Sequence, residues 1–523
     1  MPENIFGVCA SCVSFTVMVF FVLLVRFEQL QNLGEAYDVS VISPRNYFLF
    51  TPLLPGVTVG TNEERSIVEP IRKFCLRGGR EVFKFYEAKC TGVDVANNRV
   101  ICADMSPVSV KDANGIGKAM EFSLPYDYLV VAVGATTNTF NTPGVPENVQ
   151  FLKSIEDAQA LRTKIMDAIE TANLPGVSDA ERRRLLQFVV VGGGPTGVEF
   201  AAEVNDFFEE DLKPYFPSFV HDFSVVLIQS GDHILNTFDK RISEYTEAKF
   251  KRQNIKVLTE TRVKAVNPTE LVVLDKKTGV VVTLPYGVCM WSTGLKQKKI
   301  IRTIASSIPE QNHKLALLTD RFLKVKGTEN VFAMGDCSEV EQPLLQKHLK
   351  ELFVQADLNG DGVLEKEEFA AFLEDVVEDY PQLAVYSQKV GDLFEDFDTN
   401  KDGVLSLEEF TQCLKIVDSK VKTLSATAQV ASQQGKYLAK SFNSRAQGLV
   451  ASPFFYSHTG MLAKIGATDA VADLPSLGPL SGFVTWWVWG AVYLTNQFSL
   501  RNRVLVALDW CKVQVFGRDV SRF

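Results

Sequence analysis

The sequence predicts an α/β fold with parallel sheets, interrupted by an inserted all-α pair and followed by an apolar C-terminal helical region. Three observations support this class. Short apolar runs alternate with helix-like segments, which is typical of βαβ units. One of these runs leads into a glycine-rich turn. An acidic window, residues 345–413, breaks the alternation with helix-rich sequence that carries a repeated twelve-residue pattern.

Length and charge narrow the class of protein. The chain has 523 residues and a mass of 58.1 kDa, which is too long for one compact core. Its formal net charge is −9. A nucleic-acid binder needs a basic surface, so no nucleic-acid partner is expected. The acidic window holds 17 Asp and Glu against 5 Lys, a net charge of −12, and this leaves about +3 for the rest of the chain.

Two apolar runs predict strands of a first sheet. Residues 37–43 form a short strand that leads into the turn Pro44-Arg45-Asn46. Residues 128–133 form a buried parallel strand that ends at Gly134. Residues 51–56 contain two prolines and are expected to be a loop.

A glycine-rich loop predicts a dinucleotide site. Gly192, Gly194 and Gly197 form the pattern G-x-G-x-x-G between a strand at 188–191 and a helix from about Thr196. The first glycine permits a tight turn, the second lets backbone N–H groups approach a pyrophosphate, and the third lets helix and strand pack closely. A purely structural glycine turn is the alternative.

The following strand, residues 224–229, ends at Gln229 instead of an acidic residue. An NAD site usually has Asp or Glu there to accept a hydrogen bond from the ribose 2′-OH, whereas Gln229 does not repel a 2′-phosphate. We therefore expect NADPH to be favoured, alone or beside NADH. The alternative is that Gln229 accepts from the 2′-OH and the site prefers NADH. A helix capped by Ser154 is expected over 154–173.

Two twelve-residue loops in the acidic window match the EF-hand calcium loop. Each has oxygen-bearing side chains at positions 1, 3 and 5, glycine at 6, a backbone carbonyl at 7 and glutamate at 12, as Ca²⁺ requires. A solvated acidic helix pair would not place glycine and glutamate correctly twice. We expect two Ca²⁺ sites, with the ligands Asp357, Asn359, Asp361, Val363 and Glu368 in one loop and Asp398, Asn400, Asp402, Val404 and Glu409 in the other.

The C-terminal region contains a short apolar helix rich in tryptophan. Residues 483–494 are apolar, but this run is shorter than the ~20 residues that span a bilayer. Trp and Tyr favour the lipid–water boundary, so we expect monotopic contact with membrane lipid, followed by a mixed helix to about Val515. A buried helical hairpin or a dimer contact is the alternative.

Six segments carry a family resemblance: residues 43–48, 50–55, 132–135, 189–203, 333–337 and 428–433. Together they are similar to type II (alternative, rotenone-insensitive) NAD(P)H:quinone oxidoreductases. The paired EF-hands add a similarity to the calcium-dependent external enzymes of mitochondria. The resemblance covers roughly residues 35–523.

The resemblance implies two Rossmann-like nucleotide-binding domains of the disulfide-reductase type, with FAD in the first and NAD(P)H in the second. The implied divisions are a hydrophobic N-terminus (1–34), two parts of the FAD domain (35–150 and 326–344), the NAD(P)H-binding domain (151–325), the EF-hand insertion (345–420), the last FAD-domain helix with the quinone site (421–450) and the membrane anchor (451–523).

The resemblance also implies residues that hold FAD. Ser43, Pro44 and Arg45 would lie near its adenosine end, and Gly134 would lie near the flavin. Asp336 would hydrogen-bond the ribityl–pyrophosphate region.

Three further residues are implied in proton and quinone chemistry. Glu199 matches the family's acidic residue near the redox centre, a proton relay to quinone; a carboxylate favoured by the helix dipole is the alternative. Gln429 and Gln433 would line the quinone pocket, although their spacing alone also suits a solvated helix face.

The implied activity is calcium-dependent and does not pump protons: a hydride passes from NAD(P)H to FAD, and electrons then pass to ubiquinone. Family members form homodimers and attach to the mitochondrial inner membrane on its intermembrane-space side. Ser521-Arg522-Phe523 is a degenerate relative of the S-K-L peroxisomal signal, which gives peroxisomes as a minor alternative.

The N-terminal segment departs from the family pattern. The expected first G-x-G-x-x-G is absent, because residues 1–50 contain only Gly7 and Gly34. An uncharged run at 5–25 stands in its place, with three interpretations: a misassigned or spliced start, a surrogate first strand within 13–25 with weakened FAD binding, or a transmembrane anchor. The alternative function is therefore a calcium-responsive membrane protein on the same fold with a defective flavin site.

Overall fold

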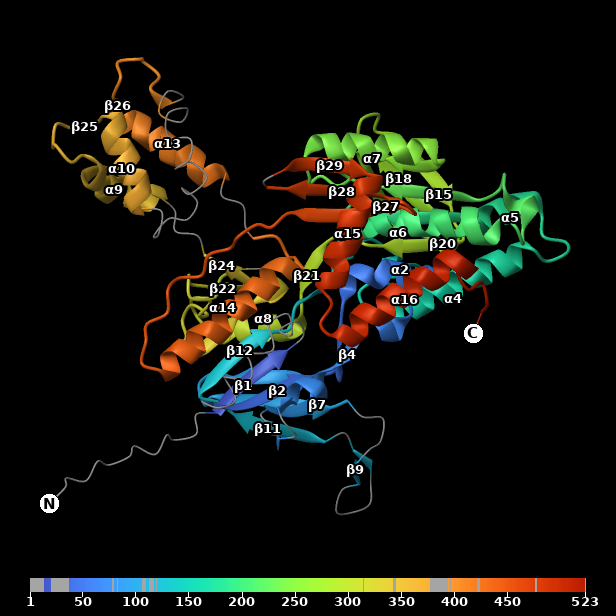
Figure 1. Ribbon diagram of the computed structural model, residues 1–523, viewed down its shortest axis with the longest axis horizontal. Helices are drawn as coiled ribbons and strands as arrows, with labels where there is room; N and C mark the ends of the chain where they lie inside the picture. The colour runs from blue at the N-terminus through green and yellow to red at the C-terminus, as the bar shows by residue number, and fades with distance from the viewer. Residues whose placement is uncertain are drawn as a thin grey trace. The chain divides into compact units, whose positions relative to one another are not determined.

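The chain forms two compact units, each assembled from several segments (Figure 1). Unit 1 comprises 1–44, 77–134 and 297–456, and unit 2 comprises 45–76, 135–296 and 457–523. The structure is a computed structural model that describes residues 14–19, 37–77, 80–81, 83–105, 110–111, 117–118, 120–313, 315–341, 345–376, 394, 397–420, 424–475 and 477–522.

Unit 1 is built on a seven-stranded sheet with the order β11-β8-β7-β2-β1-β12-β23. The strands from β7 to β23 are parallel, whereas β8 and β11 form an antiparallel edge. Unbroken apolar runs suit parallel strands that are covered on both faces. The strands are β1 (Ser14–Val19), β2 (Asp38–Ser43), β7 (Phe83–Asp94), β8 (Arg99–Asp104), β11 (Glu121–Pro125), β12 (Tyr128–Ala132) and β23 (Val331–Ala333).

The N-terminal apolar run contributes a strand to the middle of this sheet. β1 pairs with β2 on one side and with β12 on the other, and Val17 lies opposite both Val41 and Val130. This strand lies within 13–25, where the interpretation of a surrogate first strand places it. The residues that follow β1, 20–36, lie outside the described residues. No helix in the described part of the chain is long and apolar enough to cross a membrane.

An aromatic cluster packs the helix α14 (Ala428–Ala446) into unit 1. The buried ring of Phe442 lies 5.4 Å from the ring of Tyr128 and 5.0 Å from that of Phe332, centroid to centroid. Tyr37 donates its hydroxyl to the Phe442 carbonyl oxygen at 3.0 Å. This helix lies within residues 421–450, where the resemblance places the last helix of the FAD domain.

The described part of the acidic window is mainly helical (Figure 1), and it has its own hydrophobic core. Phe369 and Phe410 are fully buried in that core. An antiparallel pair, β25 (Val363–Leu364) and β26 (Leu405–Ser406), joins the two predicted calcium loops. The described helices are α9 (Leu349–Ala356), α10 (Lys366–Val376) and α13 (Leu407–Lys420).

Unit 2 contains a four-stranded parallel sheet with the order β16-β15-β14-β20. The predicted helix at 154–173 is present as α4, and the Ser154 hydroxyl caps it by accepting the Asp157 N–H at 3.1 Å. The strands are β14 (Gln187–Val191), β15 (Ser224–Ile228), β16 (Ile255–Leu258) and β20 (Val288–Trp291), and the helices are α4 (Ile155–Ala172), α5 (Asp179–Leu185), α6 (Pro195–Asp206) and α7 (Lys240–Arg252). An antiparallel sheet follows, formed by β17 (Thr261–Val266), β18 (Glu270–Asp275) and β19 (Val281–Pro285).

Residues 51–56, expected to be a loop, are helical instead. The 3₁₀ turn Thr51–Leu53 leads into α2 (Leu54–Val59). Each proline lies in the first turn of its helix, where a missing N–H breaks no hydrogen bond. Gly60 ends α2 with a φ of 83°. The prediction of a loop was wrong because the prolines mark helix starts here.

The C-terminal region also differs from a purely helical expectation. It begins with an antiparallel sheet, and two helices follow that sheet (Figure 1). Strands this short carry little periodicity, so the apolar helix after them dominated the sequence pattern. The elements are β27 (Met461–Gly466), β28 (Asp469–Leu474), β29 (Gly478–Gly482), α15 (Phe483–Thr495) and α16 (Leu500–Phe516).

We expect Phe442→Ala to lower the free energy of unfolding by about 3–5 kcal/mol, because it empties a fully packed ring site. The matched control is Phe455→Ala, whose ring is 57% exposed and whose loss should change stability by about 0.5 kcal/mol at most. Urea unfolding followed by circular dichroism measures both. Equal effects would contradict the packing assigned to α14.

Candidate functional site

The glycine loop joins β14 to α6 in unit 2. Gly192 has a φ of 118°, and a Cβ added there would lie 2.9 Å from the Ser292 carbonyl oxygen. A Cβ on Gly197 would lie only 1.9 Å from the Gly192 carbonyl oxygen. A Cβ on Gly194 would meet nothing within 4 Å, so the backbone at the helix N-terminus is open. This geometry suits a pyrophosphate, and nucleotide binding by these three glycines remains a prediction.

Gln229 turns its amide into the glycine loop. Its Oε1 accepts the Gly193 N–H at 3.2 Å, and its Nε2 donates to the His233 carbonyl oxygen at 3.3 Å. The side chain therefore ties the end of β15 to the loop. Sequence reasoning did not single out Gly193, because it occupies a variable position of the motif. A Cβ there would lie 2.8 Å from Ile234 Cγ2, so close packing requires a glycine at this position too.

A row of carboxylates follows the glycine loop along one face of α6. Glu199, Glu203 and Asp206 are spaced at helical intervals of four and three residues, and all three are buried. Burial raises the pKa of Glu199 to about 8, and the nearby charge of Glu203 adds to the increase. Burial also raises the pKa of Asp206 to about 7. Glu199 therefore holds a proton at neutral pH.

Glu203 differs from its neighbours because donors surround its two oxygens. Lys464 Nζ lies 2.6 Å from Oε1, and the Thr61 hydroxyl donates to Oε2 at 2.7 Å. The Arg518 guanidinium lies 3.7 Å from Oε2. Burial on its own raises the pKa of Glu203, but these two cations and the hydrogen bonds outweigh it and hold the pKa below its usual range. Glu203 is therefore ionised.

Glu199 borders a small cavity in unit 2. Pro52, Leu53 and Trp489 line the cavity beside it. The Lys464 backbone N–H donates to Glu199 Oε1 at 3.1 Å. Sequence reasoning missed Lys464, because it lies 265 positions from Glu199 and belongs to the sheet that was not expected.

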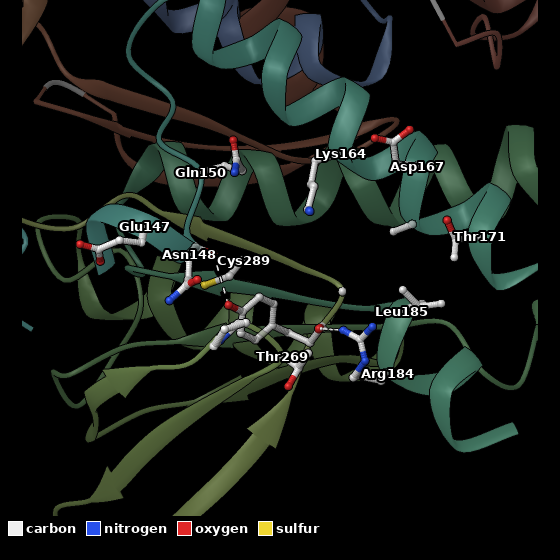
Figure 2. Close-up of a pocket in the computed structure, with 14 residues that line it drawn as sticks. Glu147, Asn148, Gln150, Lys164, Asp167, Thr171, Arg184, Leu185, Thr269 and Cys289 are labelled. Atoms are coloured by element: carbon white, nitrogen blue, oxygen red, sulfur yellow. Dashed lines mark hydrogen bonds between the residues drawn. The ribbon is translucent and has the colours of Figure 1, made fainter. Parts of the chain in front are cut away.

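A larger cavity of about 360 Å³ lies at the other end of the parallel strands of unit 2 (Figure 2). Leu185 and Gly287, which precede β14 and β20, line it. Arg184 donates to the Tyr286 carbonyl oxygen at 2.6 Å, and Tyr286 donates its hydroxyl to the Asn148 carbonyl oxygen at 3.2 Å (Figure 2). None of the predicted site residues is among those that line this cavity.

In unit 1 the residues predicted to contact flavin gather at the carboxyl ends of parallel strands. Ser43 ends β2, Gly134 follows β12 with a φ of 65°, and Asp336 lies in the turn after β23. Ligands of open α/β sheets bind at this edge. Gly335 has a φ of 70° and donates its N–H to Gln434 Oε1 at 2.7 Å. Buried Gln434 was missed, because its spacing does not distinguish it from the adjacent glutamine.

The remaining predicted residues of FAD and quinone sites lie in both units. Pro44 ends the first segment of unit 1, whereas Arg45 belongs to unit 2, where its guanidinium lies 3.8 Å from Glu156. Gln429 and Gln433 are half-buried on α14. The Tyr456 hydroxyl donates to Gln429 Oε1. Their roles remain predictions.

Each predicted calcium loop folds around its own acidic residues. The first-position aspartate accepts backbone N–H groups from within the loop, and the glutamate at position 12 accepts others. In the part of the chain that the structure describes, no three His, Cys, Asp or Glu side chains form a metal-binding group. The predicted donor set consists only of oxygen atoms and suits Ca²⁺. The bonds include Gly362 N–H to Asp357 (3.0 Å), Asn359 N–H to Glu368 (3.1 Å), Gly403 N–H to Asp398 (2.9 Å) and Thr399 N–H to Glu409 (3.0 Å).

Family comparisons first define the class of protein. Residues 27–356 match the pyridine nucleotide-disulphide oxidoreductase family. Residues 458–519 match the NDH2 C-terminal domain, and residues 339–415 match an EF-hand domain pair. The chain is therefore an enzyme, an oxidoreductase of the two-nucleotide-domain type with an EF-hand insertion, and the predicted fold class is confirmed.

Individual relatives narrow the class to one family. The mitochondrial external alternative NAD(P)H-ubiquinone oxidoreductase B1 of Solanum tuberosum is 44% identical over 509 residues, which cover 93% of this chain and 87% of the relative. The external alternative NADH-ubiquinone oxidoreductase of Yarrowia lipolytica is 39% identical, covering 93% and 77%. The solved structure of NDH2 from Plasmodium falciparum in complex with NADH has a TM-score of 0.84 and 31% identity, covering 98% and 100%. The chain belongs to the external alternative NAD(P)H-ubiquinone oxidoreductases.

We expect Gly197→Ala to weaken NADH binding about tenfold or more, equal to ~1.4 kcal/mol or more of binding free energy. The added methyl collides with the Gly192 carbonyl oxygen and pushes α6 away from the loop. Gly92→Ala is the control, because its Cβ would make an ordinary 3.4 Å contact with Ile101. Calorimetric titration measures both affinities. Unchanged NADH affinity in Gly197→Ala would contradict this role of the loop.

Proposed function

We propose that this chain is a calcium-dependent, non-proton-pumping NAD(P)H dehydrogenase that passes electrons through FAD to membrane ubiquinone. The observation that carries the proposal is the construction of α6. Its N-terminus forms the open glycine loop, and its next turn presents buried Glu199, which holds a proton at neutral pH. The names of the relatives, NAD(P)H-ubiquinone oxidoreductases of mitochondria, support the substrate pair and a mitochondrial location.

Glu199 is the proposed proton donor. NAD(P)H loses a hydride and becomes NAD(P)⁺, while the quinone gains an electron pair and two protons and becomes the quinol. The overall reaction therefore takes up one proton, which Glu199 supplies as it becomes a carboxylate. Gln429 and Gln433 are the proposed quinone-pocket residues, supported by their half-buried position on α14.

The residues at the strand ends of unit 1 fit FAD. FAD supplies the hydride acceptor when bound. Asp336 would hydrogen-bond its ribityl–pyrophosphate region and Gly134 would lie beside the flavin, with Ser43, Pro44 and Arg45 at the adenosine end. The turn at Gly335 is open, because a Cβ there would meet only the Ala431 Cβ, at 3.5 Å.

The C-terminal helices are the proposed membrane contact and lie on the intermembrane-space side of the inner membrane, in a homodimer. Exposed apolar side chains on both helices support this assignment. Trp487 of α15 is 62% exposed and Phe516 of α16 is 83% exposed. Exposed tryptophan favours the lipid–water boundary, where a quinone dissolved in the bilayer is within reach.

Calcium is proposed to act through α14. This helix follows the insertion directly, and Gln434 on it holds the backbone of Gly335, next to Asp336. Reorientation of the EF-hand helices on binding Ca²⁺ would shift α14 and, through this hydrogen bond, the turn at Asp336.

The proposed activity is tested on the purified chain. We expect yellow flavin absorbance and NADPH–quinone activity that calcium stimulates and a chelator abolishes. The double variant Glu368→Gln/Glu409→Gln should lose the calcium stimulation, because each glutamate is the bidentate ligand of its loop. Glu367→Gln/Glu408→Gln, which removes the same charges beside the ligands, is the control and should keep it. Absence of flavin absorbance together with absence of calcium-stimulated NADPH–quinone activity would contradict the proposal.

Preference for NADPH is tested separately at Gln229. We expect Gln229→Glu to raise the KM for NADPH by about tenfold or more while that for NADH stays within a few fold, because the new carboxylate repels a 2′-phosphate. The NADH measurement is the internal control. An unchanged ratio of the two KM values would show that Gln229 does not select the nucleotide.

A further inference from the structure

The ionised state of Glu203 depends on contacts from three distant segments of unit 2. Thr61 follows α2, Lys464 lies on β27, and Arg518 follows α16. Thr61 connects two of these contacts, because its hydroxyl accepts from Arg518 Nε at 2.9 Å and donates to Glu203. Both carboxylate oxygens of Glu203 therefore have donors, and removal of its charge from water is compensated.

Arg518 is itself held in place. Its side chain is 2% exposed, and its Nη1 lies 2.7 Å from Asp211 and 2.8 Å from Glu210. Its backbone N–H also donates to Asp211 at 2.7 Å. Gly517 has a φ of 75°, and a Cβ there would lie 2.8 Å from the same carboxylate, so glycine permits this close approach. The guanidinium is a fixed cation beside Glu203, because it donates hydrogen bonds to Thr61, Glu210 and Asp211.

Glu199 lies one turn before Glu203 on the same face of α6 and receives much weaker support. Its one hydrogen bond among those described above is a neutral backbone N–H, from Lys464. Residues four apart on a helix have Cβ atoms about 5–6 Å apart, so the two carboxyl groups interact strongly in this buried setting. With Glu203 ionised, a second negative charge at Glu199 is strongly disfavoured.

We propose that Glu203 is a positioning residue: its fixed negative charge, added to the effect of burial, helps keep the neighbouring Glu199 protonated until quinone is reduced. The proposal rests on the proposed role of Glu199 as proton donor. The two residues therefore have different roles. Glu203 binds the two cations and supplies the field, and Glu199 carries the exchangeable proton.

The other charged and titratable groups around these carboxyls act in known directions. Burial raises the pKa of Glu199, Lys464 lowers it, and Glu203 raises it further. Tyr493 of α15 also faces Glu199, and its own pKa is raised by burial and by that carboxylate. Asp206 faces Glu203 and Lys464 from the next turn. Arg518, Glu210 and Asp211 are further charged residues next to this group.

The test is an infrared titration of the Glu199 carboxyl group in the resting holoenzyme, with the band assigned by its loss in Glu199→Gln. We expect a midpoint near pH 8 in the unaltered chain. In Glu203→Gln the midpoint should fall by about one pH unit or more, because the repulsion is gone while the Lys464 cation remains. Glu209→Gln is the matched control: it removes an exposed carboxylate paired with Lys213, and the midpoint should not move.

A second variant guards against misfolding of Glu203→Gln, which leaves Lys464 without its partner. Glu203→Gln/Lys464→Met removes the raising and the lowering charge together, so its midpoint should return toward that of the unaltered chain. A midpoint unchanged in Glu203→Gln, or a double variant displaced as far as the single one, would overturn the inference.

Turnover separates this inference from the proposed function. If Glu199 is the proton donor, kcat falls as pH rises through its pKa, and this alkaline limb should move to lower pH in Glu203→Gln together with the infrared midpoint. If the infrared midpoint moves and the limb does not, the positioning role of Glu203 is supported and the role of Glu199 in turnover is refuted.

Discussion

The close approach of Gly197 to the Gly192 carbonyl oxygen is the constraint on which the functional half of unit 2 depends. It sets the residue at which α6 begins, and the start of a helix fixes the direction in which each of its side chains points. Its N–H groups point at the open loop, and Glu199, Glu203 and Asp206 point into the protein. A shift of the helix start by one residue would rotate the carboxylates by about 100°, away from Lys464 and Arg518. One backbone contact therefore determines both the nucleotide loop and the acidic row.

The three buried carboxyl groups can lie side by side on α6 only because their surroundings differ chemically. Three buried carboxylates on one helix face would repel one another if all were ionised. Two cations from later in the chain pair with Glu203 and keep it ionised, whereas Glu199 and Asp206 respond to burial by holding protons at or near neutral pH. The same burial thus produces an ion pair at one position and an acid at the next. The difference lies in the number of donors at each carboxylate.

Local signals predicted most of the fold. Strand–glycine–helix sequence placed β14 and α6, Ser154 marked the start of α4, and the repeated loops defined the insertion, because each of these patterns lies within one turn or one element. The failures have a shared cause. Proline at 52 and 55 is compatible with a loop or with a helix start, depending on its neighbours. Lys464 and Arg518 reach α6 only through tertiary contacts. Neither Lys464 nor Arg518 lies in a periodic pattern or a motif from which its contact with α6 could be predicted.

The depth of Glu203 has a consequence for how the protein responds to its surroundings. Mobile ions screen charges at a surface within roughly 8 Å at physiological ionic strength, but they screen a buried pair of charges much less. The pair of Lys464 and Glu203 has side chains that are 9% and 6% exposed. The electric field at Glu199 therefore comes mainly from fixed charges of the protein and much less from mobile ions in the solvent. Changes in salt around the molecule leave the readiness of this acid to give up its proton nearly constant.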